Sequence, residues 1–84
     1  MYNIYYSDIV IKQDVPKLSP PVKLLIQEAI NSKLMRDPVK FGKPLRYNLK
    51  NCRSLRCGDY RIIYQILQKK INILVIKHRR DCYS

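Results

Sequence analysis

The chain of 84 residues is 46% hydrophobic, which fits one globular domain with a modest core and excludes an intrinsically disordered chain. We therefore expect a single domain over residues 1–84. No apolar run reaches the roughly 18 residues that a membrane helix needs, and the opening stretch MYNIYYSDIV lacks the basic region of a signal peptide. We expect a cytoplasmic protein with no segment in a membrane.

The net charge of +11 is the strongest compositional signal, because 17 basic residues stand against only 6 acidic ones. Charge of one sign makes the folded chain repel itself, and an anionic partner would relieve that repulsion. Nucleic acid is the first candidate partner, an acidic protein the second and a membrane surface a distant third. A charge that only keeps the protein soluble is the simpler alternative.

The three cysteines, Cys52, Cys57 and Cys82, are an odd number at no framework spacing, which indicates free thiols in a reducing compartment. A zinc site is not expected, since the chain has one histidine and no C-x-x-C pair. Cys52 and Cys57 stand five residues apart, so on one strand they would face opposite sides. We expect neither a metal nor another cofactor.

The first half of the chain predicts a strand followed by helices. Residues 2–6, YNIYY, alternate as a strand does, and Ser7 precedes a segment that we interpret as a short helix ending near Asp14. A longer helix is predicted from the capping residue Ser19, with Pro20 at the first helical position. Its apolar residues form one stripe that packs on a sheet: Val22, Leu25, Ile26, Ala29, Ile30 and Leu34.

The second half of the chain predicts a sheet. Residues 36–45, RDPVKFGKPL, are expected to form a loop, because two prolines and a glycine interrupt them. Strand-like runs then follow at short spacing, over residues 45–50, 52–57, 60–67 and 71–77. Their short turns favour antiparallel pairing. The predicted fold class is therefore α+β: an N-terminal strand, one short and one longer helix, and an antiparallel β-sheet meander with the helices on one face.

The stretch RCGDYRIIYQIL, residues 56–67, predicts a hairpin with the two-residue turn Gly58-Asp59, because glycine adopts positive φ readily. That register opposes Arg56 to Arg61, and directly opposed residues share a face of the sheet. The expected core face carries Leu55, Tyr60, Ile62, Tyr64 and Ile66. The expected second face carries Ser54, Arg56, Arg61, Ile63 and Gln65.

Two directly opposed arginines destabilise a hairpin through their repulsion. A phosphate group between Arg56 and Arg61 would replace that repulsion with charge-assisted contacts, so we interpret the pair as an anion clamp on an exposed face. The alternative is that both side chains extend into solvent or pair with Asp59 or Asp81.

The C-terminal stretch KHRRDCYS, residues 77–84, adds potential cations at the end of the last predicted strand. Lys77, Arg79 and Arg80 carry charge at neutral pH, and His78 is the side chain that titrates near neutrality without help. Tyr83 supplies a hydroxyl that could give or take a proton. The stretch could equally be a plain basic tail on RNA or DNA, and a lone histidine is more often structural than catalytic.

Two motifs, LRCGDYRIIY at residues 55–64 and HRRDCY at residues 78–83, are fairly specific in combination. From about Asp14 to Tyr83 the chain resembles the RelE branch of the RelE/ParE superfamily, the toxins of bacterial type II toxin–antitoxin modules. The resemblance implies cleavage of mRNA in the ribosomal A site without a metal ion, through attack of a 2′-hydroxyl on the adjacent phosphate. That reaction needs a base, an acid and cations around the phosphate.

The resemblance also implies roles for particular residues. Arg61 would stabilise the phosphate, Arg79 would be the arginine of the C-terminal basic motif, and Tyr83 would be the terminal catalytic tyrosine. His78 is a further candidate for proton transfer. The expected contacts to RNA phosphates are Lys43, Lys50, Arg53, Arg56, Lys77 and Arg80.

The chain departs from the best-studied RelE pattern, which has two lysines in the strand before the turn, where this chain has Cys52 and Ser54. A shifted alignment would offer Arg53 or Lys50 instead. Two alternatives therefore stay open: a toxin homologue that binds only its antitoxin and operator DNA, and a ParE-like inhibitor of DNA gyrase, against which the HRRDCY ending counts. The implied partners are an acidic RelB-like antitoxin, the ribosome and mRNA, and operator DNA through the antitoxin complex, all in the bacterial cytoplasm.

Overall fold

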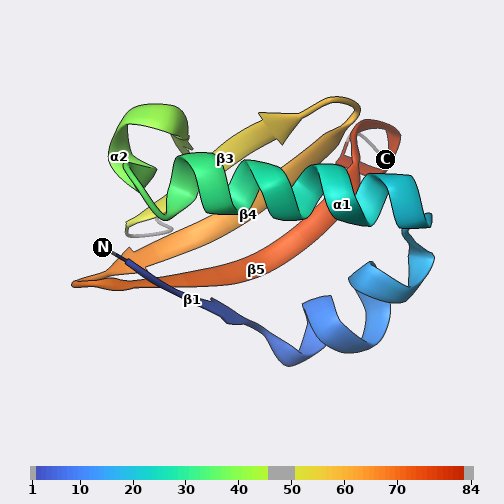
Figure 1. Cartoon of the computed structure of the whole chain (residues 1–84), viewed down its shortest axis with the longest axis horizontal. Helices are drawn as coiled ribbons and strands as arrows, with labels where there is room; N and C mark the ends of the chain where they lie inside the picture. The colour runs from blue at the N-terminus through green and yellow to red at the C-terminus, as the bar shows by residue number, and fades with distance from the viewer. Residues whose placement is uncertain (1, 46–50, 83–84) are drawn as a thin grey trace.

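The computed structural model describes residues 2–45 and 51–82, which form one five-stranded sheet with helices packed on one face (Figure 1). The strand order is β1-β5-β4-β3-β2. Strands β3, β4 and β5 form the predicted antiparallel meander, whereas β1 joins β5 in parallel. The predicted α+β class is confirmed. The strands are β1 (Asn3–Tyr6), β2 (Lys43–Pro44), β3 (Cys52–Cys57), β4 (Tyr60–Leu67) and β5 (Lys70–His78).

Ser7 connects β1 to the predicted short helix, which consists of the turns η1 (Val10–Asp14) and η2 (Val15–Lys17). The Ser7 hydroxyl accepts a hydrogen bond from the Val10 N–H at 3.2 Å and donates one to the Leu74 carbonyl of β5 at 3.3 Å. This one side chain therefore both starts the helical segment and fastens it to the sheet.

The helical segment runs three residues past Asp14, where we expected it to end. Pro16 permits this, because it lies in the first turn of η2, where its missing N–H has no helical partner to lose. Asp14 is buried, and its carboxylate accepts the Ile76 backbone N–H of β5 at 2.9 Å. That bond fixes the end of η1 against the sheet.

The longer helix begins as predicted, with Ser19 before α1 (Pro20–Ala29), and it continues as the wider turn η3 (Ile30–Leu34). Leu25 departs from the predicted stripe, because it is 48% exposed. It lies about 100° around the helix from the buried Ile26, at the edge of the apolar face. The buried part of the stripe is Ile26, Ala29, Ile30 and Leu34.

The prediction of a loop over residues 36–45 is wrong in part, since this stretch contains α2 (Pro38–Phe41) and β2. Asp37 caps α2, accepting the Lys40 N–H at 3.1 Å, and Pro38 occupies the first helical position, where proline is favourable. The strand predicted over residues 45–50 lies outside the described residues except for Leu45, whose N–H donates to the Cys52 carbonyl at 3.1 Å.

The β3–β4 hairpin has the predicted register, with Arg56 opposite Arg61 and Leu55 opposite Ile62. Gly58 adopts a φ of 59°, which the two-residue turn requires and which glycine alone takes without strain. On the other side of β4, Leu74 is an extra residue of β5 opposite the step from Ile63 to Tyr64. Such a bulge increases the local twist of the sheet.

The core lies between the sheet and the helices, on the face predicted from the hairpin. Leu55, Ile62 and Tyr64 are buried, and Tyr60 and Ile66 pack against them. Among the described residues, no helix combines the length and the apolar character needed to cross a membrane. The buried cluster is Val10, Leu18, Ile26, Ala29, Ile30, Leu34, Leu55, Cys57, Ile62, Tyr64, Ile71, Ile73 and Ile76.

A polar cluster, buried at Tyr64 and partly exposed at Arg53, joins α2 to the sheet. The Tyr64 hydroxyl donates to the Pro38 carbonyl. Arg53 of β3 donates from Nη2 to the Val39 carbonyl at 2.7 Å, and from Nε and Nη2 to the Gly42 carbonyl at 3.1 and 2.8 Å. Gly42 must lack a side chain, because a Cβ there would collide with the Tyr64 hydroxyl. These contacts hold β2 beside β3.

The Tyr64 hydroxyl contributes to stability in a way that denaturation can measure. A Tyr64→Phe variant leaves the Pro38 carbonyl without this buried donor, so we expect a loss of about 1–3 kcal/mol in the free energy of unfolding. Urea denaturation at pH 7 gives the value. Tyr5→Phe is the matched control, because Tyr5 is 47% exposed and should tolerate the loss of its hydroxyl.

The same pair of proteins should differ in its pH dependence. Burial raises the pKa of Tyr64, partly opposed by the nearby Arg53 charge, so the folded state favours the neutral hydroxyl. In the unfolded chain a tyrosine ionises near about pH 10. The stability advantage of the wild type over Tyr64→Phe should therefore be complete below pH 10 and shrink as the pH rises above it. An advantage that stays constant to pH 11 would contradict this account.

Candidate functional site

Cations gather on the face of the sheet opposite the helices, which we call the outer face. Arg56 of β3 lies opposite Arg61 of β4, and Arg61 lies opposite Lys77 of β5. These three residues, the cation row, cross three neighbouring strands side by side. The predicted pairing of two arginines is therefore part of a longer row.

A small hollow of about 40 Å³ opens beside the cation row, at the tip of the hairpin. The turn η4 (Arg79–Cys82) reaches it because the Arg79 N–H donates to the Asp59 carbonyl at 2.6 Å. Arg56 is partly fixed there, since its Nε donates to the Gly58 carbonyl at 3.3 Å. We call this the arginine hollow; its lining residues are Arg56, Gly58, Asp59, Tyr60, Arg61 and Arg79.

The arginine hollow is a favourable place for an anion. Arg56, Arg61 and Arg79 line it, against one carboxylate-bearing residue, Asp59. Guanidinium groups remain charged at any physiological pH and match phosphate with paired N–H donors. The arrangement can bind a phosphate and stabilise additional negative charge that develops on it.

The structure brings together some of the predicted site residues. Arg56, Arg61 and Arg79 meet at the arginine hollow, and Lys77 adjoins them in the cation row. Lys43 also lies on the outer face, because it pairs with Ser54 of β3. Arg80 is exposed in η4. Two further predicted residues, Lys50 and Tyr83, lie outside the described residues.

Arg53 does not lie with the other predicted phosphate contacts. It pairs with Tyr64 and so points to the helix face, away from the cation row. Its guanidinium donates to the carbonyls of Val39 and Gly42. The structure therefore corrects the interpretation of Arg53 as an RNA contact, and gives it the role of joining α2 to β3.

His78 also lies away from the cation row. It pairs with Tyr60 at the end of β5, on the face opposite to Lys77, and the two rings meet edge-on with centroids 5.1 Å apart. Its Nδ1 accepts the Arg80 backbone N–H at 3.2 Å, which requires that this nitrogen carry no proton. His78 thus supports the first residues of η4 and does not line the arginine hollow.

The positions where the RelE pattern has lysines carry no cation. Ser54 lies half-buried on the outer face between Lys43 and Ile63. Cys52 is buried, and burial raises the pKa of its thiol, so the thiol stays protonated at neutral pH. Burial likewise raises the pKa of Cys57, with a smaller opposing effect from Lys33. Both thiols are free, and neither can supply a charge to the site.

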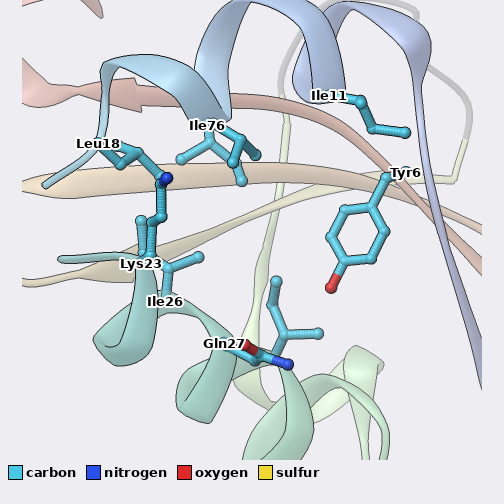
Figure 2. A pocket seen from close by; sticks show the side chains of 9 residues that line it. Tyr6, Ile11, Leu18, Lys23, Ile26, Gln27 and Ile76 are labelled. Atoms are coloured by element: carbon cyan, nitrogen blue, oxygen red, sulfur yellow. The ribbon is translucent and has the colours of Figure 1, made fainter. Parts of the chain in front are cut away.

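Sequence reasoning missed an apolar groove of about 340 Å³ on the helix face, between the short helices, α1 and the end of β5 (Figure 2). Figure 2 shows the Tyr6 ring beside Ile11, with its hydroxyl toward α1. Ile11 is 55% exposed at the rim, where Lys23 supplies a positive charge. The lining residues are Tyr6, Ile11, Val15, Leu18, Lys23, Ile26, Gln27, Ile30 and Ile76.

Fold and site together define a small basic α+β protein with three arginines around a hollow at a hairpin tip, and it is similar to known proteins. The family described as the ParE toxin of the type II toxin–antitoxin system, parDE, matches residues 9–83. The toxin RelG of Mycobacterium tuberculosis is 34% identical over 74 residues, which cover 86% of this chain and 85% of RelG. The toxin RelE of the same organism is 32% identical over 73 residues, which cover 84% and 75%.

A solved structure agrees with the sequence comparisons. A chain in the crystal structure of the toxin–antitoxin complex RelBE2 from Mycobacterium tuberculosis has a TM-score of 0.83 and 32% identity, with 93% of this chain and 98% of that chain covered. The protein therefore belongs to the RelE/ParE superfamily of type II toxin–antitoxin toxins.

The repulsion within the cation row predicts a response to phosphate. An Arg56→Gln variant should be more stable than the wild type at low ionic strength, by about 0.2–1 kcal/mol, because it removes one of two opposed like charges. Inorganic phosphate should raise the melting temperature of the wild type more than that of the variant. Thermal melts with and without phosphate test both statements.

Arg36→Gln is the matched control for this experiment, because Arg36 is exposed and follows η3, outside the cation row. It removes the same charge without touching the arginine hollow. An equal effect of phosphate on all three proteins would show that phosphate acts only as a salt.

Proposed function

We propose that this toxin is an endoribonuclease that cleaves mRNA on the ribosome in the bacterial cytoplasm and thereby inhibits translation. The observation that carries the proposal is the arginine hollow, lined by Arg56, Arg61 and Arg79. The likeness to proteins named as RelE-type toxins supports it. The HRRDCY ending also favours RNA cleavage over a ParE-like action on DNA gyrase.

In the proposed reaction a ribose 2′-hydroxyl attacks the adjacent phosphorus, and the bond from phosphorus to the 5′-oxygen breaks. The proton of the 2′-hydroxyl goes to a base, and the leaving 5′-oxygen takes a proton from an acid. The products are a 2′,3′-cyclic phosphate end and a 5′-hydroxyl end. The phosphate gains negative charge on the way, so cations fixed around it accelerate the reaction.

Arg61 is the central cation in this proposal, because it lies between Arg56 and Lys77 in the cation row and also lines the arginine hollow. Arg56 and Arg79 bind the same phosphate from either side. Lys77, Lys43 and Arg80 bind neighbouring phosphates of the strand. The phosphate is held by guanidinium groups throughout, which fits the absence of lysine at Cys52 and Ser54.

Tyr83 is proposed as the group that exchanges a proton with the reacting oxygens, on the strength of the motif alone. His78 is given a positioning role instead, because its Nδ1 holds the Arg80 N–H and its ring packs on Tyr60. It acts on the reaction by keeping η4, and with it Arg79, at the arginine hollow.

An Arg61→Ala variant should lose at least about 100-fold in cleavage rate, which is the usual effect of removing one donor that stabilises transition-state charge. Primer extension on a reporter mRNA, translated in a purified bacterial system, measures the cuts. Tyr83→Phe is run in parallel, and Arg36→Ala serves as the control of equal charge change outside the site.

Cuts of wild-type strength from Arg61→Ala would refute the role of the arginine hollow. No cuts from a folded wild-type protein that still binds its antitoxin would favour the alternative in which the chain only binds antitoxin and operator DNA. Inhibition of DNA gyrase by that protein would favour the ParE-like alternative.

We also propose that the partner in the cell is an acidic antitoxin, part of which occupies the apolar groove. The net charge of +11 favours binding of an acidic partner chain. The groove can bind apolar side chains of that partner, and Lys23 at its rim can pair with an acidic one. Ile76 lines the groove and the next residue, Lys77, belongs to the cation row. A chain that leaves the groove around the end of β5 would thus reach the arginine hollow and block it.

An Ile11→Asp variant should weaken antitoxin binding by about tenfold or more, because it places a negative charge at the rim of the apolar groove and repels an acidic partner. Isothermal titration with the antitoxin of the same module gives the affinity. Val39→Asp is the matched control, since Val39 is 53% exposed in α2 and does not line the groove. Equal losses of affinity in both variants would indicate general charge repulsion. An unchanged affinity of Ile11→Asp would refute the groove as the binding site of the antitoxin.

A further inference from the structure

Strand β1 lies at the edge of the sheet, beside β5 (Figure 1), and it contains the aromatic residue Tyr5. Tyr5 pairs with Asn72 of β5, and Asn72 pairs with Gln65 of β4, so these three residues share one face. Gln65 is four residues from Arg61 on the same strand, and even spacing keeps them on the same side. Tyr5 therefore lies on the face of the cation row. Its neighbour Ile4 points the other way and packs against the core.

The Tyr5 ring is available for contact, since the residue is 47% exposed. Among the described residues, the other strongly exposed aromatics are Tyr6, which lines the apolar groove, and Phe41, which lies in α2. Neither of them is on the outer face. Tyr5 alone of these three can thus meet a ligand that lies across the cation row.

A cation accompanies the Tyr5 ring. The Lys70 ammonium lies over it, 5.8 Å from the ring centroid, and Lys70 is itself exposed. Lysine beside an aromatic ring offers two contacts to a nucleotide at once: a flat surface for the base and a charge for the adjacent phosphate.

The distance between Tyr5 and the cation row suits a single-stranded nucleic acid. Gln65 lies four positions along β4 from Arg61, and β1 lies two strand spacings from β4, which gives a straight line of about 16 Å. That span corresponds to a few nucleotides of an unpaired strand. Between the two ends lie Ile63 and Val75, half-buried apolar side chains, and the amides of Gln65 and Asn72. Apolar surface and amides can contact bases and their edges.

We propose that Tyr5 is a base-stacking subsite for the RNA strand whose scissile phosphate lies in the arginine hollow, with Lys70 binding a phosphate next to the stacked base. This inference rests on the proposed function and adds to it a second anchor. The strand crosses the outer face diagonally, from the tip of the β3–β4 hairpin to the edge strand β1. Its two fixed points, a phosphate at one end and a base at the other, set which nucleotide is placed for cleavage.

The test measures binding of a short single-stranded oligoribonucleotide, fluorescently labelled and methylated at its 2′-oxygens to prevent cleavage, by fluorescence anisotropy at low salt. Tyr5→Leu should weaken binding by about tenfold, the usual loss for one stacked base, whereas Tyr5→Phe should bind as the wild type does. Leucine keeps apolar bulk on the exposed strand, so loss of binding in this variant reports the missing aromatic face and not a failure to fold.

Oligonucleotides with a single abasic position make the test specific. In the wild type one position, a few nucleotides from the phosphate held by the arginines, should be most sensitive to removal of its base. In Tyr5→Leu that position should lose its effect, because the base and the ring contribute to one interaction and their removals are not additive.

The binding and cleavage measurements distinguish failure of the Tyr5 subsite from failure of the proposed function. Weaker binding in Arg56→Gln together with unchanged binding in Tyr5→Leu would overturn the Tyr5 subsite and leave the proposed function standing. No binding by the wild type at low salt, or none that depends on Arg56, would overturn the subsite, whereas the proposed function is decided separately by the cuts of the wild type and Arg61→Ala on translated mRNA. If Tyr5→Leu instead weakens only the antitoxin complex, the ring belongs to the protein interface and the subsite proposal is wrong.

Discussion

The register of the β3–β4 hairpin decides which side chains reach the outer face, because side chains alternate along a strand with a period of two residues. A slip by one residue would turn Arg61 into the core and expose Ile62, which is fully buried. Burying a guanidinium without a partner is far more unfavourable than any gain from the slip. The positive φ of Gly58 and the buried pair of Leu55 and Ile62 therefore hold one register.

That register also creates the repulsion on which the candidate site depends. The core side of the same strands contributes the favourable free energy, through buried side chains such as Ile62, Ile73 and Ile76. The outer side places Arg56, Arg61 and Lys77 beside one another. The buried core and the candidate site thus lie on opposite faces of one sheet. The apolar face can hold together an array of like charges that an isolated hairpin would not tolerate.

Much of this arrangement was predictable because its signals are local. The Gly58-Asp59 turn fixed the expected pairing of Arg56 with Arg61, and the sequence Ser19-Pro20 marked the start of α1. Helix α2 also has a local signal, because Asp37 before Pro38 is the same combination of capping residue and proline as Ser19 before Pro20.

Other features leave no local trace in the sequence. The place of Arg53 depends on the carbonyls of α2, which the fold alone brings to β3. The apolar groove depends on how η1 and α1 are spaced in the fold, and the pattern of apolar residues along each helix does not predict that spacing. The parallel pairing of β1 with β5 joins segments nearly seventy residues apart in the chain, as in the pair Asn3 and Lys70.

This last pairing has a consequence for the synthesis of the protein. In the described sheet, β1 is the first strand made and its neighbour β5 is the last, so the hydrogen bonds of β1 to the sheet wait until β5 has been made. The cation row waits for the same event, because Lys77 belongs to β5 and Arg79 follows it. A chain interrupted before β5 lacks both the closing strand and part of the arginine hollow. The order of the strands therefore prevents a nascent fragment from assembling the complete cation row and arginine hollow.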